Sequence, residues 1–232
     1  MITMKPLITL QDTSVRYKRD GNIFRRSSYH DALKSISFDI FSGETLGIIG
    51  KNGSGKSTLL RLISGVIKPD NGQIINRGAS VSLLVLQAGF NPNLNGRDNV
   101  ILSGMLQGFS RKEIKKNIDE IYEYSELDDF FYEPVRTYST GMRARLSFSI
   151  STTISPDVML IDEVLSVGDK QFREKAEQTM ITKIKSKQTV VLVTHSAAQI
   201  RRLCDRALLI DNGYSLMEGD PDKVLQLYEE LP

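Results

Sequence analysis

The stretch from Gly50 to Thr58 constrains the fold most, because it has the spacing G-x-x-x-x-G-K-[ST] of a phosphate-binding loop. An apolar run, Thr45 to Ile49, precedes it, and a helix-forming run, Leu59 to Ile63, follows it. Glycines let backbone N–H groups turn inward around phosphate oxygens, and a helix N-terminus favours an anion. A glycine-rich turn that only resembles the motif is the alternative. The sequence predicts a strand–loop–helix unit that binds nucleotide phosphates.

Each residue of this loop has a predicted role. Lys56 is expected to reach the β- and γ-phosphates of ATP, and the Ser57 hydroxyl to hold Mg²⁺. The nucleotide-binding residues predicted here are Gly50, Lys51, Asn52, Gly53, Ser54, Gly55, Lys56, Ser57 and Thr58.

Two adjacent carboxylates follow a second apolar run, Val158 to Ile161. Successive side chains of a strand point in opposite directions, so Asp162 and Glu163 cannot do the same job. Asp162 suits the Mg²⁺ shell, and Glu163 suits polarising the water that attacks the γ-phosphate. An Asp-Glu pair that merely caps a helix is the other interpretation.

The composition is that of an ordinary soluble chain. The 232 residues are 40% hydrophobic and carry a formal net charge of +2, which says little about partners. No run of apolar residues is long enough to span a bilayer, and the first residues lack a signal-peptide pattern. The single cysteine, Cys204, rules out an intrachain disulfide and is expected to be a small buried residue near a helix end.

Short apolar strands alternate with helices along the chain, which predicts an α/β core with a mainly parallel sheet. A helical block interrupts this alternation, with a capping-box spacing at Ser110 and Glu113. Asn212-Gly213 predicts a hairpin, and Asp220-Pro221 the start of a last helix. We expect a single domain, 1–232, with a catalytic core over 1–87 and 154–232 and a helical subdomain over 88–153.

Four further features indicate which class of P-loop nucleotide-binding protein this is. Gln87 lies 31 positions past Lys56, and His195 ends the apolar run after Glu163. The other two are Tyr138-Ser139-Thr140-Gly141-Met142, which opens a helix, and Ser166-Val167-Gly168-Asp169, which follows the carboxylates. A GTPase is disfavoured, because the sequence has no Asn-Lys-x-Asp motif.

This set of motifs, in this order, resembles the nucleotide-binding subunit of ATP-binding-cassette (ABC) transporters. The resemblance implies a P-loop NTPase core with a mixed sheet, an N-terminal antiparallel β subdomain and an inserted helical subdomain. It implies ATP and Mg²⁺ as cofactors, Gln87 as a Mg²⁺ ligand that senses a membrane partner, and His195 as the switch histidine. The catalytic residues would then be Glu163, His195, Gln87 and Lys56. The ligands of Mg²⁺ would be Ser57, Gln87 and Asp162.

The resemblance also implies contacts at the ends of the nucleotide. Ser139 and Gly141 of the signature would touch ATP bound by a second copy of the chain. Asp169 would belong to the D-loop and is also expected to bind the nucleotide. Tyr17 looks like the aromatic residue that stacks on adenine, and Tyr29 is the alternative because a basic insertion follows Tyr17.

The signature departs from the general Leu-Ser-Gly-Gly-Gln pattern at Thr140 and Met142. In this departure it resembles one subfamily, the bacterial exporters of O-antigen, capsule and teichoic acid. Ala88 to Asn99 is similar to the Q-loop region of that subfamily. The sequence ends at Pro232, so we expect neither a C-terminal carbohydrate-binding domain nor a long extension. O-antigen is the leading substrate and capsule the second.

The subfamily implies partners as well. They are a second ATPase subunit, two copies of an integral membrane permease, and a polyprenyl-pyrophosphate-linked polysaccharide, but no nucleic acid. The expected location is peripheral, on the cytoplasmic face of the inner membrane. A soluble ABC ATPase of DNA repair, translation or cofactor assembly is the alternative. Repair members need a long coiled coil and translation factors two cassettes, and neither fits 232 residues.

The segment Arg16 to His30 has five Lys or Arg against one Asp. A solvated hairpin loop is the simpler interpretation. The sharper one is that Arg16, Lys18, Arg19, Arg25 and Arg26 bind the pyrophosphate of the transported lipid or anionic lipid at the membrane.

Overall fold

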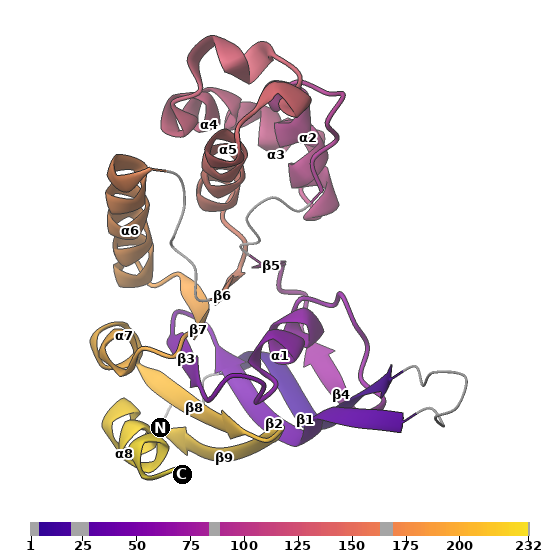
Figure 1. Cartoon of the computed structure of the whole chain (residues 1–232), viewed down its shortest axis with the longest axis vertical. Helices are drawn as coiled ribbons and strands as arrows, with labels where there is room; N and C mark the ends of the chain where they lie inside the picture. Colours follow the sequence, from indigo (N-terminus) through magenta and orange to yellow (C-terminus); the bar gives the residue numbers. More distant parts are fainter. Residues whose placement is uncertain (1–4, 20–27, 84–88, 163–168, 232) are drawn as a thin grey trace. The chain divides into compact units, whose positions relative to one another are not determined.

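The computed structural model describes residues 5–19, 28–83, 89–162 and 169–231 (Figure 1). Its contacts divide the chain into two compact units. The first comprises Met1–Ala79, Leu160–Glu163 and Lys187–Pro232, and the second Ser80–Met159 and Val164–Ser186. The predicted boundaries at 87/88 and 153/154 stay a prediction, because compactness in one conformation does not show which segments move together.

Two sheets make up the β structure. Strands β1 (Pro6–Arg19), β2 (Ser28–Phe41) and β4 (Asn71–Asn76) form an antiparallel sheet of order β2-β1-β4. The second sheet has six strands in the order β5-β6-β7-β3-β8-β9. Its strands are β3 (Thr45–Ile49), β5 (Val81–Leu83), β6 (Val158–Asp162), β7 (Thr189–Val193), β8 (Arg206–Asp211) and β9 (Tyr214–Gly219).

The central strand β3 runs parallel to β7 on one side and to β8 on the other, whereas β9 returns antiparallel to β8. All residues of β3 and β7 are buried, as expected of parallel strands covered on both faces. Asn212 and Gly213 have φ of 48° and 83°, the left-handed conformations that the predicted hairpin requires. The predicted α/β fold, with its antiparallel N-terminal sheet and mixed second sheet, is confirmed.

Helices of the first unit are α1 (Lys56–Ile63), α7 (Ala197–Leu203) and α8 (Pro221–Glu230). Asp220 caps α8 and Pro221 opens it, as predicted. Cys204 ends α7 and is partly buried, and burial raises the pKa of its thiol to about 12. Cys204 lies at the helix end, as predicted, but it is partly rather than fully buried and packs against an apolar cluster of α7, β3 and α8.

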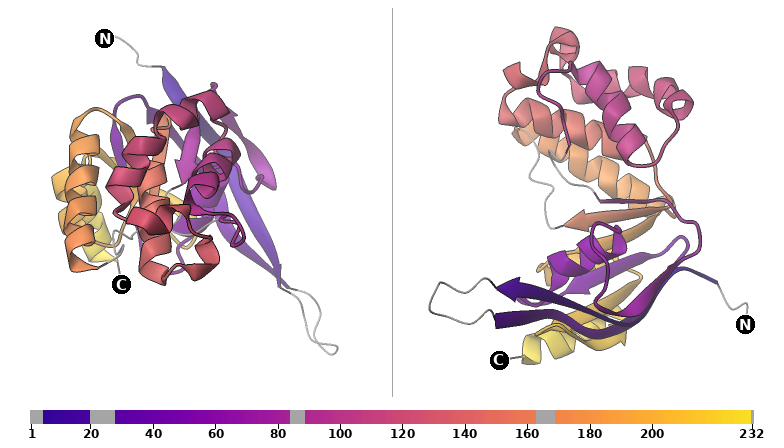
Figure 2. Two further views of the ribbon diagram at one scale, coloured as in Figure 1. Left: turned by 90° about the horizontal axis from the view of Figure 1, so that it is seen from above. Right: turned by 90° about the vertical axis from the view of Figure 1, so that its right-hand side faces the viewer.

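Strands β1 and β2 extend into the basic segment further than predicted (Figure 2). Tyr17 pairs with His30 and Arg19 with Ser28, so strand pairing enters the segment from Arg16 to His30, whose simpler interpretation from the sequence is a loop. The backbone pairing between β1 and β2 continues through these residues in spite of the local positive charge. Arg16 forms an ion pair with Asp31 and stacks on Tyr29 at 5.7 Å. Residues 20–27, including Arg25 and Arg26, lie outside the described residues.

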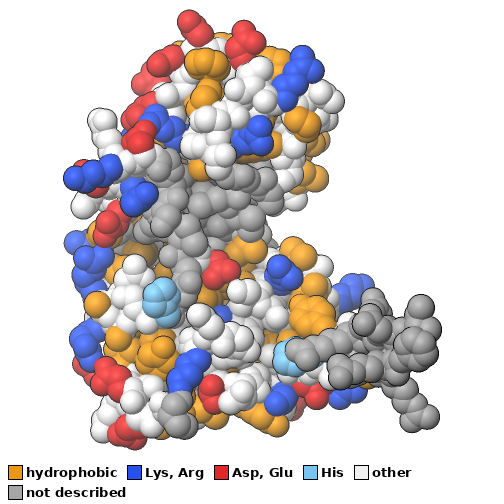
Figure 3. Space-filling model, viewed as in Figure 1, with side chains coloured by type: hydrophobic (Ala, Val, Ile, Leu, Met, Phe, Trp, Pro, Cys, Tyr) orange, Lys and Arg blue, Asp and Glu red, His pale blue; other side chains and the backbone are white. Residues whose placement is uncertain are grey.

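The second unit is mainly helical. Its helices are α2 (Gly96–Leu106), α3 (Arg111–Lys116), α4 (Ile118–Ser125), α5 (Thr140–Thr153), α6 (Lys170–Lys185) and the 3-10 turns η1 (Asp128–Tyr132) and η2 (Val135–Thr137). Ser110 and Glu113 form the predicted capping box at the start of α3. On the face drawn in Figure 3, acidic side chains of this unit gather along its upper edge.

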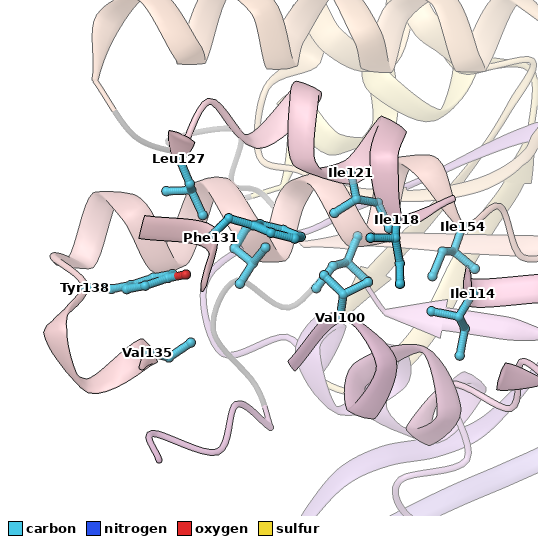
Figure 4. Packing of buried hydrophobic residues seen from close by; sticks show 11 residues of the cluster. Val100, Ile114, Ile118, Ile121, Leu127, Phe131, Val135, Tyr138 and Ile154 are labelled. Carbon is cyan, nitrogen blue, oxygen red and sulfur yellow. The ribbon is translucent and has the colours of Figure 1, made fainter. Parts of the chain in front are cut away.

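One apolar core holds α2 to α5 together (Figure 4). Phe131 lies at its centre with no exposed surface, and Tyr122 packs edge-on against it at 5.1 Å. The other buried members are Val100, Ile114, Ile118, Ile121, Leu127, Val135, Tyr138, Leu146, Ile150 and Ile154. Tyr138 donates a hydrogen bond to the Phe130 carbonyl at 2.6 Å, so its buried hydroxyl is satisfied.

This core yields a stability prediction with a neighbouring control. Phe131→Ala should lower the free energy of unfolding by about 3–5 kcal/mol, because a buried aromatic ring leaves a cavity. Phe130 is 50% exposed, so Phe130→Ala should cost less than about 1 kcal/mol. Urea unfolding followed by circular dichroism measures both, and equal losses would show that this core does not hold the helical unit.

Candidate nucleotide-binding site

The phosphate-binding loop joins the carboxyl end of β3 to the N-terminus of α1, where ligands bind in open parallel sheets. Ser54 N donates to the Lys51 carbonyl at 3.2 Å, which closes the loop on itself. Gly213 N donates to the Ser54 carbonyl at 3.0 Å, so the turn between β8 and β9 contacts the phosphate loop directly. The loop is therefore stabilised by one internal hydrogen bond and by one from the β8–β9 turn.

Three glycines of the loop are required by its geometry. A Cβ at Gly50 would lie 2.1 Å from the Ile210 carbonyl oxygen, and one at Gly55 would lie 2.5 Å from that of Ala32. Gly55 and Gly53 have φ of 111° and 81°, which other residues rarely adopt. Gly55 is the residue that caps α1 and offers no side-chain acceptor to its first N–H groups. These N–H groups are available to an anion.

Lys56 is buried within the loop. Its Nζ donates to the carbonyl oxygens of Gly50, at 2.7 Å, and Lys51, at 2.9 Å. Only 7% of the residue is exposed, so the loop's own carbonyls hold the ammonium group at its centre. A cation in this position can contact phosphate oxygens that enter the loop.

The remaining loop residues lie around this cation. The Lys51 side chain is exposed and reaches the Leu231 carbonyl at 3.3 Å, and Asn52 and Gly53 are exposed at the tip. The Ser54 hydroxyl is buried and has no hydrogen-bond partner among the described residues. Thr58 lines the pocket in front of the loop.

Two oxygen groups suited to a divalent cation meet beside Lys56. Ser57, in the first turn of α1, donates its hydroxyl to Asp162 Oδ2 at 3.4 Å. Asp162 is the last residue of β6 and is partly buried. Hydroxyl and carboxylate oxygens are ligands that Mg²⁺ uses in nucleotide sites, so the residues present fit this ion. Glu163 and Gln87 lie outside the described residues.

A pocket of about 340 Å³ opens in front of the loop and contains these groups. Tyr17 lies in its wall and is 37% exposed. Tyr29 is 64% exposed and instead lines a smaller pocket of about 180 Å³ with Gly53 and Asn212. The lining residues are Tyr17, His30, Ala32, Asn52, Gly53, Gly55, Lys56, Ser57, Thr58 and Asp162. An aromatic face opposite a phosphate loop suits a nucleobase joined to phosphates.

His195 follows β7, the strand next to β3, and is exposed. Thr194 N donates to the Ile48 carbonyl at 3.1 Å, so His195 begins at the same edge of the sheet as the phosphate loop. The Thr194 hydroxyl donates to Gln199 Oε1 at 2.7 Å and fixes this turn. His195 is not among the lining residues of the pocket.

The signature residues lie in the second unit. Ser139 caps α5, and its hydroxyl accepts a hydrogen bond from Met142 N at 3.2 Å. A Cβ at Gly141 would meet only Ser139 Oγ, at 3.8 Å, so packing within the described chain does not require a glycine there. The N-terminus of a helix of 14 residues, with a hydroxyl and a glycine, is a suitable contact for an anion.

Asp169 caps α6 and is tied to α5. Its carboxylate accepts from Phe172 N at 3.0 Å and forms an ion pair with Arg145 of α5. Arg145 also pairs with Glu126 at 3.3 Å, and Lys175 pairs with Glu126 at 2.6 Å. The Phe172 N–H first, and then the Arg145 guanidinium, hold the pKa of Asp169 below its usual range.

Sequence reasoning missed three contributors to these sites. His30 lines the pocket because β2 pairs with β1, and Gly213 supports the phosphate loop because β8 lies beside β3. Arg145 links Asp169 to the helix that begins at the signature. The Asn-Gly pair predicts a hairpin, but the local sequence does not indicate which other segment the hairpin contacts.

The described helices include none that is long and apolar enough to cross a membrane. The phosphate loop at a β–α junction, with a buried lysine and a serine–aspartate pair, defines a P-loop nucleotide-binding ATPase. Comparison with known families gives the particular class. Residues 33–166 match the family model described as ABC transporter, and the chain belongs to this family of ATP-hydrolysing proteins.

Similar curated proteins include two named "O-antigen export system ATP-binding protein RfbB". The one from Klebsiella pneumoniae is 41% identical over 95% of this chain and 89% of its own length. The one from Myxococcus xanthus is 43% identical over 96% of this chain, which spans about half (51%) of its length. "Teichoic acids export ATP-binding protein TagH" of Bacillus anthracis is 40% identical over 98% of this chain and 40% of its own length.

Solved structures support the fold. A dimeric ATP-binding cassette bound to ADP and Pi, described as a post-hydrolysis state, is similar with a TM-score of 0.73. It is 23% identical and is matched over 92% of this chain and 98% of its own. An ATP-binding subunit of an ABC transporter has a TM-score of 0.75 at 21% identity, covering 96% of this chain and 93% of its own.

The Asp169 ion pair gives a pH prediction. Asp169 has a lowered pKa in the folded state, so it contributes stability above its unfolded pKa, and this is lost as the pH falls through the folded pKa. Arg145→Gln removes the guanidinium and leaves the Phe172 and Gln171 N–H groups, so the Asp169 pKa should rise part of the way toward its ordinary value. Carboxyl ¹³C NMR titration measures it. Arg136→Gln, an exposed residue elsewhere in the unit, is the control, and an unchanged Asp169 titration in Arg145→Gln would contradict the pairing.

Proposed function

We propose that this chain is the ATPase subunit of an ABC exporter of a lipid-linked polysaccharide, with O-antigen as the substrate. The similarity to the Klebsiella O-antigen export protein, over 95% of this chain and 89% of that one, carries the proposal. The site supports it, since the loop, Lys56 and the Ser57–Asp162 pair suit a nucleoside triphosphate with Mg²⁺. A separate membrane permease, present in two copies, would carry the polymer, and the ATPase would lie on the cytoplasmic face of the inner membrane.

Teichoic acid is the second candidate substrate. Relatives named as teichoic acid exporters are 40–44% identical, similar to the 41–43% of the O-antigen group, so identity alone does not separate the two. Both polymers belong to one substrate class, and the ATPase chemistry is the same for either. The two candidates can be separated by deleting this chain and identifying which polymer is then missing from the cell surface.

Residues of the pocket, together with Gln87, Glu163 and His195, would each have a separate role in binding or hydrolysing ATP. Lys56 and the N–H groups of α1 would bind the β- and γ-phosphates, and Tyr17 would stack on adenine. Ser57, Asp162 and Gln87 would hold Mg²⁺, which would neutralise phosphate charge. Glu163 would take a proton from the attacking water, and His195 would contact the γ-phosphate from the end of β7.

A second copy of the chain would complete each site. Gly141 is not required by packing within the described chain, and it opens a helix whose N-terminus carries the Ser139 hydroxyl. Glycine in a helix is less stable than alanine, so a contact of Gly141 with another molecule gives a physical reason for a glycine at this position. We infer that Ser139, Gly141 and Asp169 of one copy contact ATP held by the phosphate loop of the other. Closure of this homodimer around ATP would drive the permease.

Deletion of this chain in its own host tests the function. Polymer should vanish from the cell surface while lipid-linked polymer accumulates inside, and re-expression should restore export. Chemical analysis of the missing polymer distinguishes O-antigen from teichoic acid or capsule. Normal display of every surface polysaccharide in the deletion strain would contradict the proposal.

Glu163 has a sharp test. Glu163→Gln keeps the shape of the side chain but cannot take up a proton, so hydrolysis should fall by about 10²- to 10³-fold while ATP binding persists. Glu174→Gln, an exposed position on α6, is the matched control and should hydrolyse ATP at the wild-type rate. Phosphate release at saturating ATP measures both, and near-normal turnover in Glu163→Gln would remove this residue from its role.

A further inference from the structure

Helix α3 presents a strongly cationic face. Four of its six residues are Arg111, Lys112, Lys115 and Lys116, all exposed, whereas Ile114 is buried in the core. Positions four apart lie beside each other on a helix, so the four cations form two adjacent rows. They line an open hollow of about 520 Å³. We call these four residues the α3 cations.

Within the part of the chain that the structure describes, three of the four α3 cations have no ion-pair partner, and Lys116 interacts electrostatically with the Glu113 carboxylate. Arg111, Lys112 and Lys115 form no ion pair among the described residues. The one acid of α3, Glu113, is engaged by Ser110, whose N–H donates to its carboxylate at 2.9 Å. Seven acids and no Lys or Arg follow between residues 117 and 134, so charge along this unit is segregated.

Two exposed aliphatic side chains end helix α2, five positions or fewer before the Ser110 cap of α3. Met105 is 53% exposed and Leu106 69% exposed, at the end of α2. Helices α2 and α3 pack closely where Gly104 meets Ile114, since a Cβ at Gly104 would lie 2.6 Å from Ile114 Cγ1. The exposed end of α2 therefore lies beside α3.

We propose that the α3 cations, with Met105 and Leu106, form a docking surface for anionic phospholipid headgroups. Lysine ammonium groups on long flexible stems suit a fluid layer of phosphates, and adjacent aliphatic side chains can enter the interface. The hollow is open and lined only by cations, which suits a membrane surface better than the shaped contact of a protein partner. The surface deepens the proposed function by giving the ATPase its own contact with the membrane.

Vesicle binding tests the surface without the permease or ATP, so its outcome is separate from that of the export proposal. The purified full chain is floated with vesicles of phosphatidylcholine alone or with 30% phosphatidylglycerol. We expect binding only to the anionic vesicles, and weaker binding at high salt. Lys112→Gln with Lys115→Gln should weaken binding about tenfold or more, from the contribution of each basic residue near an anionic surface. Arg173→Gln with Lys185→Gln, two exposed α6 positions of this unit, is the charge-matched control and should bind like the wild type.

Leu106→Gln isolates the aliphatic contribution and should weaken binding at low and high salt alike. Thermal melting and ATP hydrolysis should be unchanged in all these variants, since none of the substituted residues lies in the nucleotide site. Equal vesicle binding by wild type and Lys112→Gln/Lys115→Gln would overturn the proposal. It would also be overturned if the wild type ignored anionic vesicles while the double variant no longer co-purified with the permease, which would make the surface a protein contact.

Discussion

The close approach of the phosphate loop to its neighbouring backbone is the constraint on which the nucleotide site depends. Gly50 lies against the Ile210 carbonyl and Gly55 against that of Ala32, with no room for a Cβ at either position. The Gly213 N–H donates to the Ser54 carbonyl, and the Lys34 N–H to the Gly213 carbonyl at 2.7 Å. Strand β2, the β8–β9 turn and the loop therefore form one connected arrangement. The loop residues Asn52, Gly53, Gly55, Lys56, Ser57 and Thr58 line the pocket that this arrangement supports.

Lys56 is fixed by the same arrangement. Its ammonium group is buried but donates hydrogen bonds to the carbonyl oxygens of Gly50 and Lys51, which offsets the desolvation of the charge. The charge is then positioned for phosphate before ATP arrives, so little reorganisation is needed at binding. Ser57 is the next residue of α1, and its hydroxyl donates a hydrogen bond to Asp162 at the end of β6. Two motifs 105 positions apart thus meet because their strands belong to the same sheet.

The parts that depend on local sequence could be predicted, and those that depend on long-range register could not. The loop, the strands that end at Asp162 and Val193, the capping box and the Asn-Gly turn each carry a signal within a few residues. The length of the β1–β2 hairpin was underestimated, because its charges suggested a loop where cross-strand pairing continues to Arg19 and Ser28. His30 in the pocket and the Arg145–Asp169 pair follow from tertiary packing, which no spacing in the sequence reveals.

We propose that the phosphate loop of one copy acts on ATP together with Ser139 and Gly141 of another. Dimers that carry two different tags, purified through both, test it by ATP hydrolysis. A dimer of Lys56→Ala with Ser139→Arg keeps one intact composite site, whereas a dimer of wild type with the doubly substituted chain keeps none. We predict that the first dimer hydrolyses ATP faster than the second. The reverse order, or equal rates, would show that the signature acts within its own chain and would contradict the account.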